Sequence, residues 1–172
     1  MNPTFAPLFA RRSVRKYQAK PVPAALVQDI LEAAMAAPSA NAKDPWEIIV
    51  VQQPETLAKI AAGLPYGKML AGAPLGFVVC GDLHRANGQC LSYLLQDCSA
   101  CIENLLLALS LAGLGGVWLG VHPREDRIAH LRALFGLPEH VVPVGVIAAG
   151  YPAETHPPRT RFTEARVHRE RW

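Results

Sequence analysis

Residues 92–121 read SYLLQDCSACIENLLLALSLAGLGGVWLGV, a long apolar segment followed by a glycine-rich turn and a shorter apolar run. The first part has helical spacing and predicts a helix from about Ser92 to Ala112, ended by Gly113. The second part predicts a strand over 117–121. Because hydrophobic side chains cover most of the helix circumference, the helix must be covered on every side. In a domain this small, a second subunit would cover it most easily.

Helical and strand patterns alternate on both sides of this segment. Apolar residues at helical spacing predict helices over about 23–35, 55–62 and 124–135, with Gly136 as the C-cap of the last one. Runs rich in β-branched residues predict buried strands over 46–51, 75–80 and 141–149. This alternation predicts an α/β or α+β sandwich in which helices cover a sheet.

The composition predicts one domain followed by a polar extension. The chain has 172 residues, of which 51% are hydrophobic and 18% charged, so it carries more apolar surface than is usual for a soluble monomer and favours an oligomer. We assign residues 1–152 to the domain. Residues 153–172 are polar, basic and proline-containing, and we expect them to be disordered or to lie on another surface.

Charge and sequence pattern exclude several classes of protein. The net charge is only +3 and the basic residues are split between the ends, which argues against nucleic-acid binding. Residues 1–10 lack the pattern of a signal peptide, and Gln96, Asp97, Glu103 and Asn104 interrupt the long apolar segment too often for a membrane span. Four cysteines do not make a disulfide scaffold, so a cytoplasmic location is expected.

The basic residues at the two ends are the main candidates for a binding site. Arg11-Arg12-Ser13-Val14-Arg15 places guanidinium groups around a hydroxyl, and Arg159-Thr160-Arg161 offers two more. Guanidinium forks and a hydroxyl suit a phosphate monoester, so the ends would form one anion pocket if they meet in space. The alternative is a solvated basic stretch. Ten of the seventeen basic residues lie at the ends: Arg11, Arg12, Arg15, Lys16, Lys20, Arg159, Arg161, Arg166, Arg169 and Arg171.

Three other motifs have both a structural and a functional interpretation. The loop Pro38-Ser39-Ala40-Asn41 is either turn chemistry or a ligand-lining loop. The glycines of 113–120 do not match a dinucleotide fingerprint, because Trp118 stands where glycine is required; Gly120 would let the backbone approach a flat ligand. Cys98 and Cys101 have redox spacing but are interpreted as buried core residues, and the six histidines show no metal-ligand spacing, so no metal is predicted.

Five segments, in order, resemble the FMN-dependent nitroreductase-like superfamily in its shorter members. They are RRSVRKY, APSANAKDPWEIIVV, DCSACIENLLLALSLAGLGGVWLGVHP, GLPEHVVPVGVIAAGYPAE and PPRTRFTEARVHRERW. The resemblance spans nearly the whole chain. It implies an α+β fold with a mainly antiparallel or mixed four-stranded sheet flanked by helices. It also implies a homodimer with FMN at the interface, in which the tail over 153–172 crosses to the partner and adds a fifth strand.

The resemblance also implies the cofactor contacts. Arg11, Ser13, Arg159 and Arg161 would hold the FMN phosphate, with Arg12 near the phosphate or the ribityl chain. Arg15 would reach the pyrimidine edge of the ring near N1 and O2, and Lys68 would also approach this edge. Leu119 and Gly120 would present their backbone to the flavin edge near N5, and the second subunit would contribute Pro38, Ser39 and Asn41. In the family, the asparagine of this loop usually comes one place later and glutamine precedes Pro-Trp. Here Asn41 comes one place earlier and Lys43-Asp44 replaces the usual pair. The Asn41 contact and the substrate preference are therefore expected to differ.

The activity implied is a ping-pong oxidoreductase that has no catalytic residue of its own. NADH or NADPH would give hydride to flavin N5, and a nitroaromatic, quinone or flavin acceptor would then take the electrons at the same face. Two alternatives remain open: a flavin-holding or ligand-sensing module without turnover, and an FMN-dependent dehydrogenase of a small substrate. The sequence does not choose between NADH and NADPH.

Overall fold

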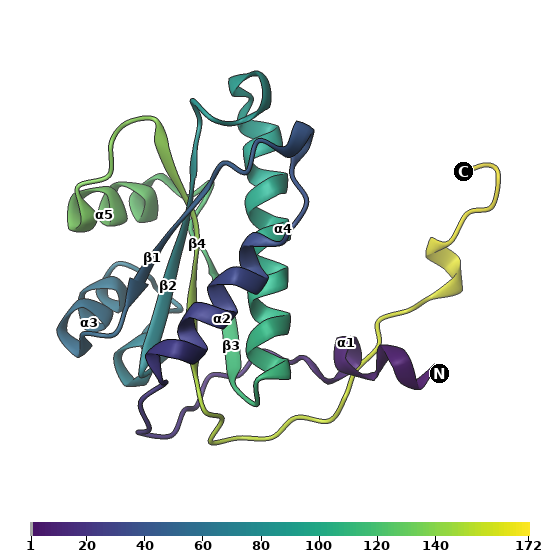
Figure 1. The fold of residues 1–172 in the computed structure, drawn as a ribbon, viewed down its shortest axis with the longest axis horizontal. Coiled ribbons are helices and arrows are strands. Elements are labelled where there is room, and N and C mark those ends of the chain that lie inside the picture. Colours follow the sequence, from purple (N-terminus) through teal and green to yellow (C-terminus); the bar gives the residue numbers. More distant parts are fainter. Residues whose placement is uncertain (1) are drawn as a thin grey trace.

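A single antiparallel sheet forms the centre of the protein. The computed structural model describes residues 2–172, and within them four strands pair in the order β1-β2-β4-β3 (Figure 1). Every neighbouring pair is antiparallel. The α+β architecture and the mainly antiparallel four-stranded sheet are therefore confirmed. The strands are β1 (Trp46–Val51), β2 (Leu75–Asp82), β3 (Gly115–Gly120) and β4 (Val141–Gly150).

Helices cover both faces of this sheet. The helices α2 (Ala24–Met35) and α4 (Leu91–Leu111) lie on one face, and α3 (Pro54–Ala62) and α5 (Glu125–Phe135) lie on the other (Figure 1). The alternation of β2 explains the two layers, because successive side chains of a strand point to opposite faces. Leu75, Phe77 and Val79 pack in the core with α2 and α4. Val78 and Cys80 pack in the core with α3 and α5.

The predicted helices and strands are found where the sequence places them, with ends that differ by one or two residues. Gly136 adopts the left-handed conformation at the end of α5, with φ 63°, as a C-cap glycine should. The sequence did not predict the short helix α1 (Ala6–Ala10). It also did not predict the 3-10 turns at Pro3–Phe5, Ala40–Ala42, Lys68–Gly72, Asn87–Gln89 and Glu164–Arg166.

The long helix α4 is buried mainly on the side that faces the sheet. By length and composition it could cross a membrane, yet its buried side chains, such as Leu94 and Ile102, belong to the core between helix and sheet. On its other side Leu91, Tyr93 and Leu111 are exposed, by 40%, 44% and 68%. The single chain therefore covers one side of the apolar helix and leaves the other uncovered.

The segment after α1 is fixed against the end of the sheet. The amide of Val14 donates to the Gly116 carbonyl over 3.1 Å. The Tyr17 hydroxyl lies 2.6 Å from the Val14 carbonyl oxygen and 2.9 Å from that of Ala148. Glycine at 115 permits this approach, because an added Cβ would lie 2.5 Å from Cγ2 of Val14. The Arg11–Arg15 segment is thereby positioned beside β3.

Candidate functional site

The two ends of the chain meet around one cavity. The Arg159 amide donates to the Phe9 carbonyl over 2.9 Å, and the Arg12 guanidinium donates to the Pro157 carbonyl. An anion pocket required the two ends of the chain to meet in space, and they do so within one chain. The resulting pocket, which we call the arginine cavity, has a volume of ≈ 200 Å³ and is lined by Arg11, Arg12, Ser13, Arg15, His156, Arg159 and Arg161.

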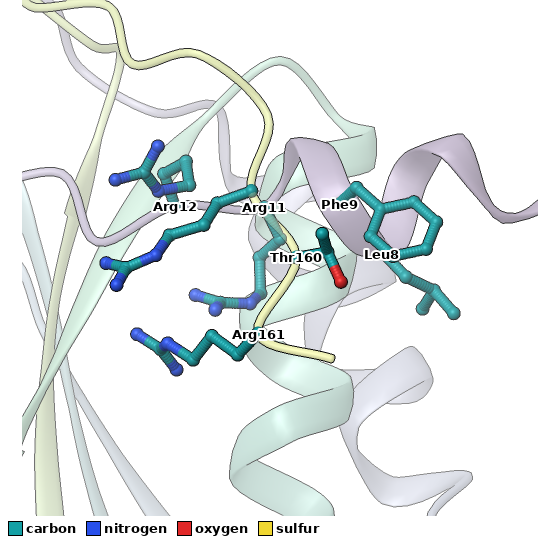
Figure 2. Close-up of a pocket in the computed structure, with 7 residues that line it drawn as sticks. Leu8, Phe9, Arg11, Arg12, Thr160 and Arg161 are labelled. Carbon is teal, nitrogen blue, oxygen red and sulfur yellow. The ribbon is translucent and has the colours of Figure 1, made fainter. Parts of the chain in front are cut away.

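A second pocket adjoins the arginine cavity and has an apolar wall. Its volume is ≈ 240 Å³, and it shares four arginines with the arginine cavity. Figure 2 shows the guanidinium groups of Arg11, Arg12 and Arg161 extending to the same side, while Leu8 and Phe9 lie on the opposite side of the tail. The helix α1, which sequence analysis missed, therefore supplies a hydrophobic edge to the site.

Most of the positive charge in the arginine cavity has no ion-pair partner among the described residues. Arg11 has an acidic partner, with its Nε 3.3 Å from Oε1 of Glu103 on α4. Among residues 2–172, no carboxylate lies within ion-pair distance of the guanidinium groups of Arg12, Arg15, Arg159 or Arg161. Guanidinium groups gathered without counter-charges repel one another and favour an anion between them. The arrangement is therefore suited to a phosphate group.

Arg15 connects the arginine cavity to another cavity along β3. This β3 cavity, of ≈ 210 Å³, is lined by Arg15, Leu64, Tyr66, Val117, Trp118, Leu119, Gly120 and Arg127. Gly120 is exposed, and a Cβ added to it would meet no atom within 4 Å. Its carbonyl accepts a hydrogen bond from Nη1 of Arg127 over 2.6 Å. A ligand lying across both cavities would pass Arg15 and then reach the backbone at the end of β3.

Glu154 and His156 belong to the site although sequence analysis did not select them. The Arg15 amide donates to Oε1 of Glu154 over 2.7 Å, and Nε2 of His156 lies 3.4 Å from the same oxygen. The hydrogen bond from the Arg15 backbone lowers the pKa of the Glu154 carboxyl, and His156 lowers it further. Glu154 thus fixes the backbone that carries Arg15. Nothing in the polar tail sequence signals this, because the partner lies at the other end of the chain.

The loop at residues 38–44 is ordered by local hydrogen bonds and lies elsewhere. The Ser39 hydroxyl donates to Oδ1 of Asp44 over 2.5 Å and accepts from the Asp44 amide over 2.9 Å. The buried Asp97 of α4 accepts from the Ala40 amide over 2.9 Å. Asn41 has a φ of 52° and donates to Oδ1 of Asn87 over 3.0 Å. Turn chemistry therefore accounts for most of the polar groups in this loop.

The single chain brings some of the predicted site residues together and leaves others apart. Lys68 is exposed at the start of its 3-10 turn, and neither it nor the 38–44 loop lines the arginine cavity or the β3 cavity. The arginine cavity contains six of the predicted residues: Arg11, Arg12, Ser13, Arg15, Arg159 and Arg161. Leu119 and Gly120 line the β3 cavity, which Arg15 also lines. Left apart are Pro38, Ser39, Asn41 and Lys68.

Comparison with known sequences assigns the fold to a family. The sequence profile of the Nitroreductase family matches residues 8–64 and 61–151. The chain belongs to the nitroreductase family. A relative from Methanothermobacter thermautotrophicus, provisionally named an NADH dehydrogenase/NAD(P)H nitroreductase, is 48% identical over 164 residues, which cover 94% of this chain and 84% of the relative. The family and fold expected from the sequence segments are thus confirmed.

Solved structures agree with this nitroreductase assignment over the whole chain. A protein from Bacteroides thetaiotaomicron with the same provisional name is 39% identical, with a TM-score of 0.93 over 100% of this chain and 99% of its own. A provisionally named nitroreductase from Desulfovibrio desulfuricans, solved in complex with FMN, is 28% identical, with a TM-score of 0.84 over 100% and 99% of the two chains. The NADPH:FMN oxidoreductase of Vibrio harveyi, solved with NAD⁺, is 26% identical, with a TM-score of 0.87 over 99% and 78%.

Proposed function

We propose that this nitroreductase is an FMN-dependent NAD(P)H oxidoreductase that holds the FMN phosphate in the arginine cavity. The observation that carries the proposal is the cluster of guanidinium groups around one cavity, of which only Arg11 has an acidic partner among residues 2–172. FMN ends in a phosphate dianion, which such a cluster binds through charge-assisted hydrogen bonds. The proposed contacts are Arg11, Ser13, Arg159 and Arg161 to the phosphate and Arg12 to the phosphate or ribityl chain.

The order of residues along the two cavities fits the rest of FMN. Arg15 lines both the arginine cavity and the β3 cavity, so it would lie between the phosphate and the ring. Its positive charge would favour the reduced ring when that ring is anionic. Leu119 and Gly120 lie beyond it, where the absence of a side chain on Gly120 leaves room for a flat group. FMN, when bound, supplies the hydride and electron transfer.

We also propose that two copies of the chain complete each site. The single chain leaves Leu91, Tyr93 and Leu111 on one side of α4 exposed, and exposed apolar surface of this kind marks a contact with another protein chain. A second copy placed on the exposed side of α4 would cover Leu111 and bring its own Pro38, Ser39 and Asn41 to the ring. The tail over 153–172, in which Phe162 is 71% exposed and which extends away from the domain (Figure 1), would cross to the partner as a fifth strand.

The proposed reaction is ping-pong. NADH or NADPH would occupy the open side of the site first, and a nitroaromatic, quinone or flavin acceptor would occupy the same place after the nicotinamide leaves. The chain would position both reactants and provide positive charge, and we assign no protein acid or base. The four cysteines are free thiols, which agrees with a reducing compartment, and we place the enzyme in the cytoplasm.

An anaerobic spectrum of the purified protein tests this function. We expect a yellow protein whose flavin absorbance disappears rapidly when NADH or NADPH is added without oxygen, and returns when a nitroaromatic or quinone is supplied. Bleaching by dithionite alone would instead support a flavin-holding module or a dehydrogenase of another substrate. A colourless protein that takes up no FMN would contradict the proposal.

A further inference from the structure

Two histidines and an aspartate meet at the end of the sheet that lies away from the arginine cavity. Asp82 is the last residue of β2, His84 follows it, and His140 comes directly before β4. The pairing of β2 with β4 brings them together, because Asp82 lies opposite Val141 in the register. The Leu83 amide donates to the His140 carbonyl over 2.9 Å and fixes the two segments to each other. Their backbone positions are therefore determined by the sheet.

The side chains of these three residues are close enough to share a ligand. Their potential ligating atoms all lie within 4.8 Å of one another. The imidazole rings of His84 and His140 stack with centroids 4.2 Å apart and an angle of 8° between their planes. The nearby cation Arg85 is engaged elsewhere, 3.0 Å from Glu47.

From this arrangement we propose that Asp82, His84 and His140 bind a divalent zinc ion. Two imidazoles and a carboxylate are ligands that Zn²⁺ prefers, and water would complete a tetrahedral site. Oδ1 of Asp82 accepts from the His84 amide over 2.8 Å, which leaves Oδ2 for the metal. His84 and His140 line a surface pocket together with Glu139, which adds a second carboxylate beside the proposed site. The sequence spacing did not indicate this zinc site, because His140 lies far along the chain from Asp82 and His84.

Binding requires a small movement of the rings. A tetrahedral site with zinc–ligand distances near 2.0–2.1 Å places ligand atoms about 3.3 Å apart, closer than the present limit of 4.8 Å. The nitrogen lone pairs of stacked rings lie in nearly parallel planes, so one ring must turn before both can point at the same ion. His84 is exposed at the surface and can make that turn. The metal would then join the end of β2 to the start of β4.

The site shares no lining residue with the arginine cavity or the β3 cavity, so its test is independent of the flavin. Untagged, chelator-treated full-length protein is titrated with zinc sulfate by calorimetry and heated with and without the metal. We expect saturation at one Zn²⁺ per chain and a higher midpoint of thermal unfolding. His84→Ala and His140→Ala should abolish both effects. Asp82→Asn keeps the acceptor oxygen and should weaken zinc binding by roughly tenfold or more.

Two control variants separate this site from adventitious binding. His168→Ala removes a histidine that stacks on Trp172 in the tail and should change nothing. Cys90→Ser removes a thiol whose pKa is lowered by hydrogen bonds from the Tyr93 and Ser92 backbone, and it should bind zinc as the parent does. Loss of binding in Cys90→Ser, no saturation at one equivalent, or unchanged binding in the double variant of His84 and His140 would overturn the proposal. If His140→Ala does not fold, zinc binding by His84→Ala decides the question, because His84 is exposed and its loss should not disturb folding.

Discussion

Replacing Arg161 with alanine tests the role of the arginine cavity most directly. Arg161 lines the cavity and has no acidic partner among the described residues, so its loss leaves no carboxylate unpaired. A hydrogen bond to a charged group contributes about 1.5–3 kcal/mol. Because 1.4 kcal/mol corresponds to a factor of ten, Arg161→Ala should weaken FMN binding by about 10- to 150-fold. The assay is an equilibrium titration of apoprotein that follows the quenching of FMN fluorescence.

Riboflavin and a matched arginine variant provide the controls for this experiment. Riboflavin lacks the phosphate, so Arg161→Ala should leave its affinity nearly unchanged. Arg171 is an exposed arginine of the tail outside the cavity, and Arg171→Ala should bind FMN as the parent does. The reasoning is refuted if Arg161→Ala binds FMN normally. It is equally refuted if the variant loses FMN and riboflavin to the same extent, because the contact would then not involve the phosphate.

Three further predictions concern the framework around the site. Tyr17→Phe removes the hydroxyl contacts to Val14 and Ala148, which should lower the free energy of unfolding by about 1–3 kcal/mol in urea denaturation; a change below the error of the method would contradict it. Gly115→Ala places a Cβ 2.5 Å from Val14, so overpacking should lower the free energy of unfolding by about 1–3 kcal/mol. A variant as stable as the parent would show that the Arg11–Arg15 segment can move away from β3. Backbone hydrogen bonds lower the pKa of Cys90, so its labelling by iodoacetamide should rise with pH around a midpoint below that of an unperturbed thiol, about 8.5. Mass spectrometry that finds another thiol labelled first would count against this prediction.

Local patterns in the sequence predicted most of the fold. The helix α4, the strands and the C-cap at Gly136 each follow from periodicity or from one residue type in a short window, and the structure has them in place. The helix α1 was missed because Ala6–Ala10 is too short to show a period. The arginines at both ends were recognised because charge is visible in the sequence, although their convergence depends on hydrogen bonds such as that from Arg159 to Phe9.

The missed parts of the site depend on contacts between distant segments. Glu154 matters because the amide of Arg15 points at it, and that relation exists only after the tail has returned to the first segment. The histidines behave in the same way, since strand register rather than spacing brings His84 to His140. The 38–44 loop was recognised as a candidate, but hydrogen bonds within one chain explain its order. Its role at the ring remains a proposal about the dimer.

The 38–44 loop and the arginines lie beside different halves of α4, and this separation has a genetic consequence. The 38–44 loop is bonded to Asp97 in the first half of the helix, whereas a cavity that includes Arg12 reaches Leu106 and Ser110 in its second half. In the proposed dimer, each active centre would combine the loop of one copy with the arginines of the other. Two inactive alleles, one altered in the loop and one in the arginines, would therefore complement each other when co-expressed, because mixed dimers regain one intact centre out of two.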